Sequence, residues 1–167
     1  MTSRSVLTLM LVALAAGCSH TYRFEHTSKV GAATIPRLSG KTIALDLSGV
    51  PPTFETDANG HHFTIVDLRE RTDDMVRRLF ARERVVTSGA TADVVLKLAL
   101  SLSMGTMFTG VSCTAVARWD VAEKGKRASA ESQQTSSIGA IANGGRNCEI
   151  ATINAVATAL EASAAKL

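Results

Sequence analysis

Aromatic residues are scarce in this chain. They make up 4% of its 167 residues, with one tryptophan, one tyrosine and five phenylalanines. Because bases are often held by stacking on aromatic side chains, the chain offers few platforms for such ligands. The charge balance is also weak, since 18 basic and 15 acidic residues leave a formal net charge of +3. Nucleic-acid-binding domains carry concentrated basic patches, so we expect no nucleic acid among the partners.

The sequence also lacks the common catalytic and metal-binding motifs. It contains neither a GxSxG nucleophile elbow nor a glycine-rich phosphate loop. His61 and His62 could bind a metal with a carboxylate such as Asp57, but no HxH or HExxH spacing completes the ligand set. Asp46 and Asp120 fall at exposed strand positions, where no cleft is expected. We therefore expect no catalytic residues, no metal and no cofactor, and the chain is not predicted to be an enzyme.

The N-terminal apolar run is too short to span a bilayer. Residues 6–17 carry no charge and follow the basic residue Arg4. A membrane-spanning helix needs roughly 20 apolar residues, whereas a secretion signal combines a positive start, a shorter apolar core and small residues at its end. We predict that residues 1–17 are a signal peptide. The alternative is a buried N-terminal helix or strand of a cytoplasmic protein.

The end of this run resembles the lipobox of bacterial lipoproteins. The matching residues are Leu14-Ala15-Ala16-Gly17-Cys18, with Ala15 at the place where the lipobox prefers leucine. The resemblance implies that Cys18 receives a diacylglyceryl group on its thiol and becomes the acylated N-terminus after cleavage. Ser19 follows the cysteine. In the lipoproteins that the sequence resembles, aspartate at this place retains the protein at the inner membrane, and serine is typical of outer-membrane lipoproteins. The resemblance therefore implies an outer-membrane location.

The remaining chain is long enough for one domain. Removal of residues 1–17 leaves 167 − 17 = 150 residues. A domain of that size buries about 70% of the surface of its unfolded chain. Residues 18–40 show little periodicity, and we predict that they form the lipidated N-terminus and a tether; the alternation of Tyr22 and Phe24 with charged residues leaves a short strand there as an alternative. Residues 41–167 are predicted to form a single domain.

The first part of this domain reads as a strand, a loop and a helix. Residues 41–50, KTIALDLSGV, alternate between apolar and polar and predict a half-buried strand, which Pro51-Pro52 ends. Residues 53–62, TFETDANGHH, are expected to form a polar loop. Residues 67–83 predict a helix that Asp67 caps. Its apolar stripe consists of Leu68, Thr72, Met75, Val76, Leu79 and Phe80.

The opposite face of the predicted helix 67–83 carries charges of both signs. Arg69, Asp73 and Arg77 are spaced four residues apart, as are Asp74 and Arg78. This spacing brings opposite charges together on one helix face. We interpret the face as a solvated, salt-bridged surface; the alternative is an anion-binding site.

The second part of the domain predicts a β-meander and a closing helix. Residues 92–104 and 111–121 each place apolar side chains on one face, and residues 127–137 form a more polar edge strand. A flexible loop over residues 138–147 leads to a helix capped by Asn147. The order β-α-β-β-β-α predicts an α+β fold. We expect a two-layer α/β sandwich, in which the sheet is one layer and the helices are the other. A mainly antiparallel sheet of about four strands carries two helices on one face, and the other face is lined by Lys97, Ser101, Thr114 and Arg118.

Two cysteines remain besides Cys18. Cys113 is in phase with Trp119 on the apolar face of its strand, and both are therefore expected in the core. Cys148 lies in the first turn of the closing helix, which covers that same face. An even pair in an exported chain favours a disulfide, and we predict one between Cys113 and Cys148. The alternatives are two separate buried thiols, or a reactive Cys148 at the helix N-terminus.

The layout of the whole domain resembles the YajG-like family of small outer-membrane lipoproteins. The similarity is carried by DLRERTDDMVRRLF, ADVVLKLALSLS and NCEIATINAVATAL, within residues 41–166. Related envelope lipoproteins of the LptE and transport-auxiliary kinds share this layout, and they act as binding or assembly partners. The resemblance implies a non-catalytic lipoprotein on the periplasmic face of the outer membrane, anchored by acyl chains on Cys18, with an envelope protein as its partner. The alternatives are a small envelope hydrolase and a carrier of lipid or peptide.

Overall fold

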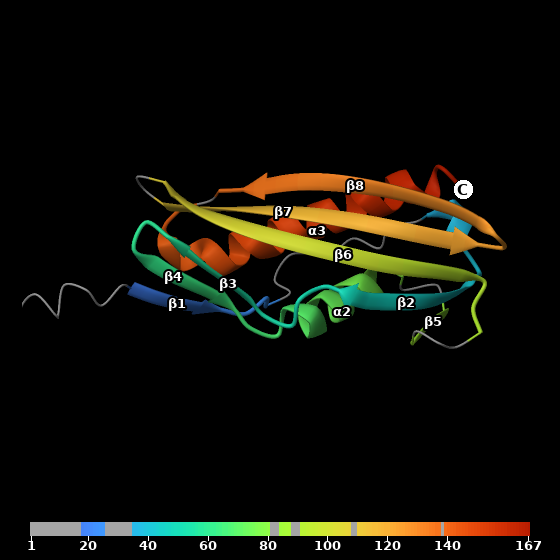
Figure 1. Cartoon of the computed structure of the whole chain (residues 1–167), viewed down its shortest axis with the longest axis horizontal. Helices are drawn as coiled ribbons and strands as arrows, with labels where there is room; N and C mark the ends of the chain where they lie inside the picture. The colour runs from blue at the N-terminus through green and yellow to red at the C-terminus, as the bar shows by residue number, and fades with distance from the viewer. Residues whose placement is uncertain (1–17, 26–34, 81–83, 88–90, 108–109, 138) are drawn as a thin grey trace, which may run out of the picture.

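In the computed structural model of the protein, the described residues form two β-sheets and two α-helices (Figure 1). The structure describes residues 18–25, 35–80, 84–87, 91–107, 110–137 and 139–167. The predicted α+β class is confirmed. The predicted single sheet of about four strands is wrong, because the described residues form one sheet of five strands and another of three.

The larger sheet has the strand order β5-β2-β6-β7-β8. The β6–β7 and β7–β8 pairs are antiparallel as predicted, whereas β2 runs parallel to both β5 and β6. The sequence analysis missed β5, a short strand that enters the sheet through its parallel pairing with β2. The bounds are β2 (Thr42–Gly49), β5 (Arg84–Thr87), β6 (Val94–Met107), β7 (Gly110–Glu123) and β8 (Lys126–Ser136).

One face of the larger sheet is buried and the other is open. The alternation of apolar residues along β6 and β7 places Leu98 and Trp119 in the core, directly opposite each other. Residues of both helices belong to the same apolar core. On the other face Lys97 and Arg118 are exposed. The predicted two-layer arrangement therefore holds for this sheet.

The smaller sheet occupies the region expected to be a polar loop. Its hairpin consists of β3 (Phe54–Ala58) and β4 (His61–Ile65), which pair in antiparallel register. Asn59 and Gly60 form the turn with φ values of 48° and 79°. Positive φ at both central residues is typical of the two-residue type I′ hairpin turn, for which Asn-Gly is the preferred sequence. The expectation of a loop over residues 53–62 was therefore wrong.

The segment that follows Cys18 is the third strand of this smaller sheet. β1 (Cys18–Tyr22) runs parallel to β4, with partners from Cys18 opposite His61 to Tyr22 opposite Ile65. Phe24, just after the strand, is buried in the core. The expected tether over residues 18–40 therefore does not apply to residues 18–25, which are part of the folded domain. Leu38 is also buried, in a short 3-10 helix (Pro36–Leu38).

The first helix, α2 (Leu68–Leu79), has the predicted buried stripe. The predicted end at residue 83 lies outside the described residues. Asp67 precedes the helix as expected but makes no capping hydrogen bond with its side chain, because its backbone is left-handed, with φ 55°. Its carboxylate instead accepts a hydrogen bond from the Arg23 guanidinium. On the exposed face, Arg77 Nε lies 2.8 Å from Asp73 Oδ2, in agreement with the salt-bridged interpretation.

The closing helix, α3 (Gly144–Ala164), begins three residues before the expected cap. Asn147 is buried inside its first turn, so the prediction that Asn147 caps the helix is wrong. Tyr22 packs against Gly144 and Gly145 so closely that a Cβ on either glycine would lie 2.8 Å from the tyrosine. The two glycines therefore serve close packing rather than a flexible loop. Further along α3, the Trp119 indole N–H donates to the Val156 carbonyl at 2.9 Å.

We expect Leu79→Ala to lower the free energy of unfolding by about 2–5 kcal/mol, because Leu79 is only 2% exposed and truncation leaves a cavity. The matched control on the exposed face of the same helix is Arg78→Ala, for which we expect a change of less than about 1 kcal/mol. Urea unfolding followed by circular dichroism measures both values. Equal losses in the two variants would contradict the burial of this stripe.

Candidate functional site at the Cys18 end

One end of the molecule gathers segments that are far apart in the sequence (Figure 1). We call it the Cys18 end. Cys18 lies opposite His61 in the β1–β4 pair, next to the β3–β4 turn. The turn residue Asn59 donates a hydrogen bond to Thr106 near the end of β6. The end is formed by Cys18, Asn59, Gly60, Thr106, Gly110, Gly139, Ala140 and Ile141.

Cys18 is an exposed, free cysteine at the first position of β1. β1 is an edge strand of the smaller sheet, so its outer side is not covered by another strand among the described residues. The predicted lipid attachment site is therefore accessible to a modifying enzyme while the rest of the domain is folded. The predicted signal peptide, residues 1–17, lies outside the described residues.

A cluster of rings lies behind Cys18 and holds β1 in place. His20 Nε2 is 3.0 Å from His61 Nδ1, and the His20 ring stacks on the buried Phe63 with centroids 5.3 Å apart. The Tyr22 hydroxyl donates to the Ile141 carbonyl at 2.7 Å, which ties β1 to the segment before α3. Burial raises the pKa of Tyr22, so the hydroxyl remains a donor at neutral pH. These contacts fix β1, and with it Cys18, against the domain.

The histidine pair does not form a joint metal site. His61 and His62 are consecutive strand residues, so their side chains point to opposite faces of the sheet. His61 faces His20, whereas His62 lies 2.8 Å from the Asp57 carboxylate. Within the part of the chain that the structure describes, no group of three potential ligands is arranged to hold a metal ion.

Asp46 and Asp120 are engaged in separate interactions on the open face of the larger sheet. Asp46 accepts a hydrogen bond from the Ser48 N–H at 2.8 Å, and hydrogen bonds from Ser48 hold the pKa of this carboxyl below its usual value. Asp120 lies 3.3 Å from the Arg118 guanidinium. The structure therefore does not bring these two carboxylates together as an acid–base pair.

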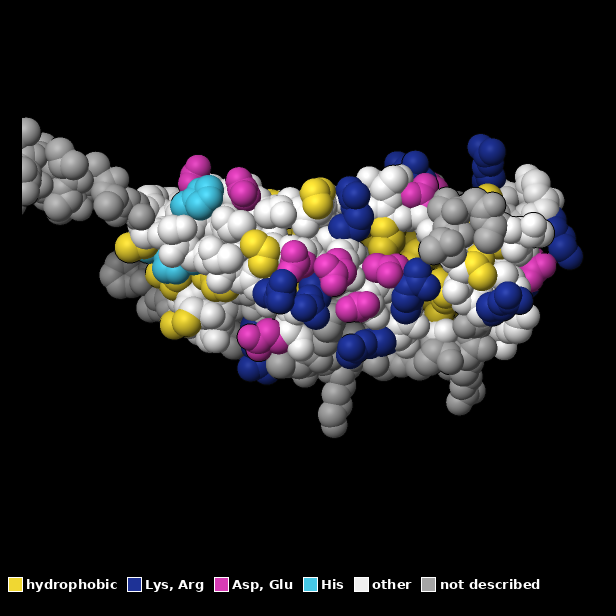
Figure 2. Space-filling model, turned by 90° about the horizontal axis from the view of Figure 1, so that it is seen from below, with side chains coloured by type: hydrophobic (Ala, Val, Ile, Leu, Met, Phe, Trp, Pro, Cys, Tyr) yellow, Lys and Arg dark blue, Asp and Glu magenta, His cyan; other side chains and the backbone are white. Residues whose placement is uncertain are grey.

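Charge is distributed unequally between the two ends of the molecule. The eight residues that form the Cys18 end include no lysine, arginine, aspartate or glutamate, and the nearest carboxylates are the exposed side chains of Glu55 and Asp57 on β3. The opposite end carries the β7–β8 turn with Glu123, Lys124 and Lys126, and Lys41 Nζ lies 2.6 Å from Glu123 Oε1. On the face shown in Figure 2, lysine and arginine side chains gather over the middle and the far end, whereas acidic and histidine side chains are seen toward the left end of the view.

A polar depression of about 400 Å³ lies beside β1 and the first turns of α3. Its deepest charged side chain is Glu149, which is 2% exposed and accepts the Glu25 N–H through Oε2 at 3.3 Å. Oε1 of the same carboxylate has no hydrogen-bond partner in the structure. Arg23 and Arg146 also line the depression. The sequence analysis missed this site, because Glu149 reads as an ordinary helix residue.

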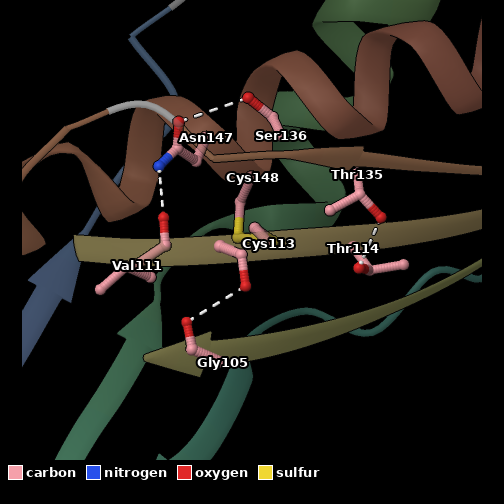
Figure 3. Close-up of a disulfide and its surroundings, with 9 residues drawn as sticks. Gly105, Val111, Cys113, Thr114, Thr135, Ser136, Asn147 and Cys148 are labelled. Atoms are coloured by element: carbon pink, nitrogen blue, oxygen red, sulfur yellow. Dashed lines mark hydrogen bonds between the residues drawn. A yellow bond between two sulfur atoms is a disulfide. The ribbon is translucent and has the colours of Figure 1, made fainter. Parts of the chain in front are cut away.

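The predicted disulfide joins β7 to the first turn of α3 (Figure 3). Cys113 and Cys148 are both fully buried, and their Cα atoms are 4.9 Å apart. That separation lies within the usual range for disulfides. The neighbouring Asn147 donates to the Val111 carbonyl at 2.7 Å and accepts a hydrogen bond from the Ser136 hydroxyl at 3.3 Å. The start of α3 is therefore held by one covalent bond and by hydrogen bonds to two strands.

No helix in the described part of the chain is long and apolar enough to cross a membrane.

Comparisons with known proteins do not place the chain in a family. No protein-family model matches it, and no curated protein matches it. Among solved structures, it is similar to the crystal structure of protein XCC0632 from Xanthomonas campestris, described as a member of the family DUF330. The two share 13% sequence identity over 88% of this chain and 89% of the other, with a TM-score of 0.48. The resemblance to the YajG-like family stays a prediction.

We expect replacement of both Cys113 and Cys148 by alanine to lower the free energy of unfolding. The disulfide closes a loop with a sequence separation of 35, and the chain-entropy model assigns about 3–4 kcal/mol to a loop of this size. Urea unfolding of the oxidised protein and of the double variant measures the loss. Alkylation of the denatured protein provides the control: two thiols that react only after reduction confirm the bond, and two that react before reduction contradict it.

Proposed function

We propose that the protein is a non-catalytic lipoprotein of the bacterial outer membrane, anchored through Cys18 and acting as a binding or assembly partner of another envelope component. The observation that carries the proposal is the placement of Cys18. The cysteine closes a lipobox-like sequence, and it is also the exposed first residue of β1. A cleavage before Cys18 would thus remove the signal and leave β1 complete.

The acyl chains would supply the membrane affinity. Each buried methylene contributes about 0.8 kcal/mol, and a single chain gives only weak, reversible binding. A lipoprotein cysteine carries two or three acyl chains, which together bind the protein to the membrane far more tightly than one chain. The domain therefore needs no membrane-spanning helix for anchoring. The Cys113–Cys148 disulfide supports an exported location, because structural disulfides persist in oxidising compartments.

The open face of the larger sheet supports a binding role. It presents small, polar and charged side chains, among them Ala99, Ser101 and Ser103 on β6. Thr114 and Thr135 are hydrogen-bonded across β7 and β8 at 2.8 Å, and Val95 is an exposed large apolar residue at one end of the face. A surface of this kind fits a protein partner. The carrier alternative finds less support, because Trp119, Leu98 and Leu160 fill the space between sheet and helices.

We expect the wild-type protein, expressed in a Gram-negative host, to incorporate a labelled palmitate analogue and to fractionate with membranes. Cys18→Ala removes the acceptor sulfur, so it should carry no label. Ser19→Ala is the matched control, because it changes the neighbouring residue, keeps the cysteine and should still be labelled. Equal labelling of the wild type and Cys18→Ala would contradict the lipoprotein proposal.

We expect Ser19→Asp to move the labelled protein from the outer to the inner membrane fraction on a sucrose gradient, since aspartate after the lipidated cysteine is the inner-membrane signal implied by the lipobox resemblance. The control is the amount of label, which should not change. Wild-type protein already in the inner membrane fraction would contradict the outer-membrane assignment and leave the lipid anchor in place.

A further inference from the structure

We propose that the Cys18 end rests directly on the phospholipid surface, so that the domain stands on the membrane with the β7–β8 turn pointing away from it. The inference rests on the proposed lipid anchor at Cys18. It goes further by identifying which surface of the domain contacts the phospholipid. Two observations carry it independently of the lipobox: residues 18–25 directly after the anchor are folded onto the domain, and the turns beside Cys18 consist of small, uncharged residues with no lysine or arginine among them.

The distance between the anchor and the domain is set by β1. A flexible linker over residues 19–40 has 22 residues and a root-mean-square reach of about 26 Å, which would let the domain move freely above the membrane. In the structure, Cys18 is already paired with His61, and adjacent strands lie about 4.8 Å apart. The acyl chains therefore leave from the surface of the domain itself.

The anchor is also held rigidly. The Tyr22 carbonyl accepts the Val66 N–H at 3.0 Å, and the Tyr22 hydroxyl reaches Ile141 at 2.7 Å. Phe24 is 1% exposed and locks the residues after the strand into the core. A pull on the acyl chains is thus transmitted to both the smaller sheet and the start of α3.

The composition of the Cys18 end suits a lipid headgroup layer. Burying an ionised side chain without a partner costs several kcal/mol, whereas small polar and apolar groups enter the interface at little cost. Asn59, Gly60, Gly139 and Ala140 are exposed or half-buried and uncharged. The nearest carboxylate, Asp57, lies two residues before the turn; its side chain is 83% exposed and lies 2.8 Å from His62 Nδ1. At the opposite end, Lys124, Lys126 and Arg127 are exposed.

The direction of the long elements then sets the orientation. α3 begins at the Cys18 end and ends near the β7–β8 turn (Figure 1). Its 21 residues span about 32 Å at 1.5 Å per residue. β6 has 14 residues and spans about 45 Å along the same axis, with its last residues at the Cys18 end. The far end of the domain, with the neighbouring part of the open sheet face, is thereby presented to the periplasm.

The test uses two exposed alanines near the two ends of α3. The variants are Ala140→Cys and Ala162→Cys, prepared in the acylated protein. An environment-sensitive fluorophore is attached to the new thiol. It reacts there alone, because Cys18 is acylated and Cys113 and Cys148 form the disulfide. The protein is reconstituted into phosphatidylcholine vesicles containing a headgroup-nitroxide lipid, which quenches only a probe at the headgroups. We expect loss of most emission from position 140 and no loss from position 162.

A flexible linker of about 20 glycines and serines between Cys18 and Ser19 is the control, since its reach of about 25 Å should abolish quenching at position 140. Quenching at neither position, or equally at both, while the protein floats with the vesicles would overturn the end-on orientation and leave the lipid anchor intact. Failure of the wild type to float would instead overturn the proposed function and this inference with it.

Discussion

The pairing of β1 with β4 is the constraint on which the relation between anchor and domain depends. Five residues that begin at Cys18 are held in parallel register by the hairpin of β3 and β4. Without this pairing, Cys18 would start a flexible segment, and the position of the lipid would say nothing about the orientation of the fold. With it, the proposed lipid attachment residue becomes a fixed point at one end of an elongated α+β domain.

The start of α3 connects this fixed point to the larger sheet. Tyr22 packs on Gly144 and Gly145, and the Cys113–Cys148 disulfide follows within one turn of the helix. Asn147 adds hydrogen bonds to Val111 and Ser136 (Figure 3). The two sheets are thereby joined through the same short stretch of helix. A domain built this way can transmit a fixed orientation from the membrane to the open sheet face, where we propose that a partner binds.

The sequence predicted those features that depend on local periodicity. Alternation along β6 and β7 correctly placed Trp119 and Cys113 in the core, and the phase of Cys113 led to the disulfide. The β3–β4 hairpin was missed, although Asn59-Gly60 is a strong turn signal, because its flanking strands are short and polar. The pairing of β1 with β4 joins segments about 40 residues apart, and no local pattern encodes it. Gly144 and Gly145 suggested a flexible loop because the sequence does not show that Tyr22 packs against them.

The measurement that tests the account most directly is mass spectrometry of the N-terminal peptide of the mature protein isolated from the outer membrane. The account predicts a peptide that begins at Cys18 and carries a diacylglyceryl group on the sulfur and an acyl chain on the amine. A mature peptide that retains residues before Cys18, or one that begins at Cys18 with an unmodified thiol, would contradict it.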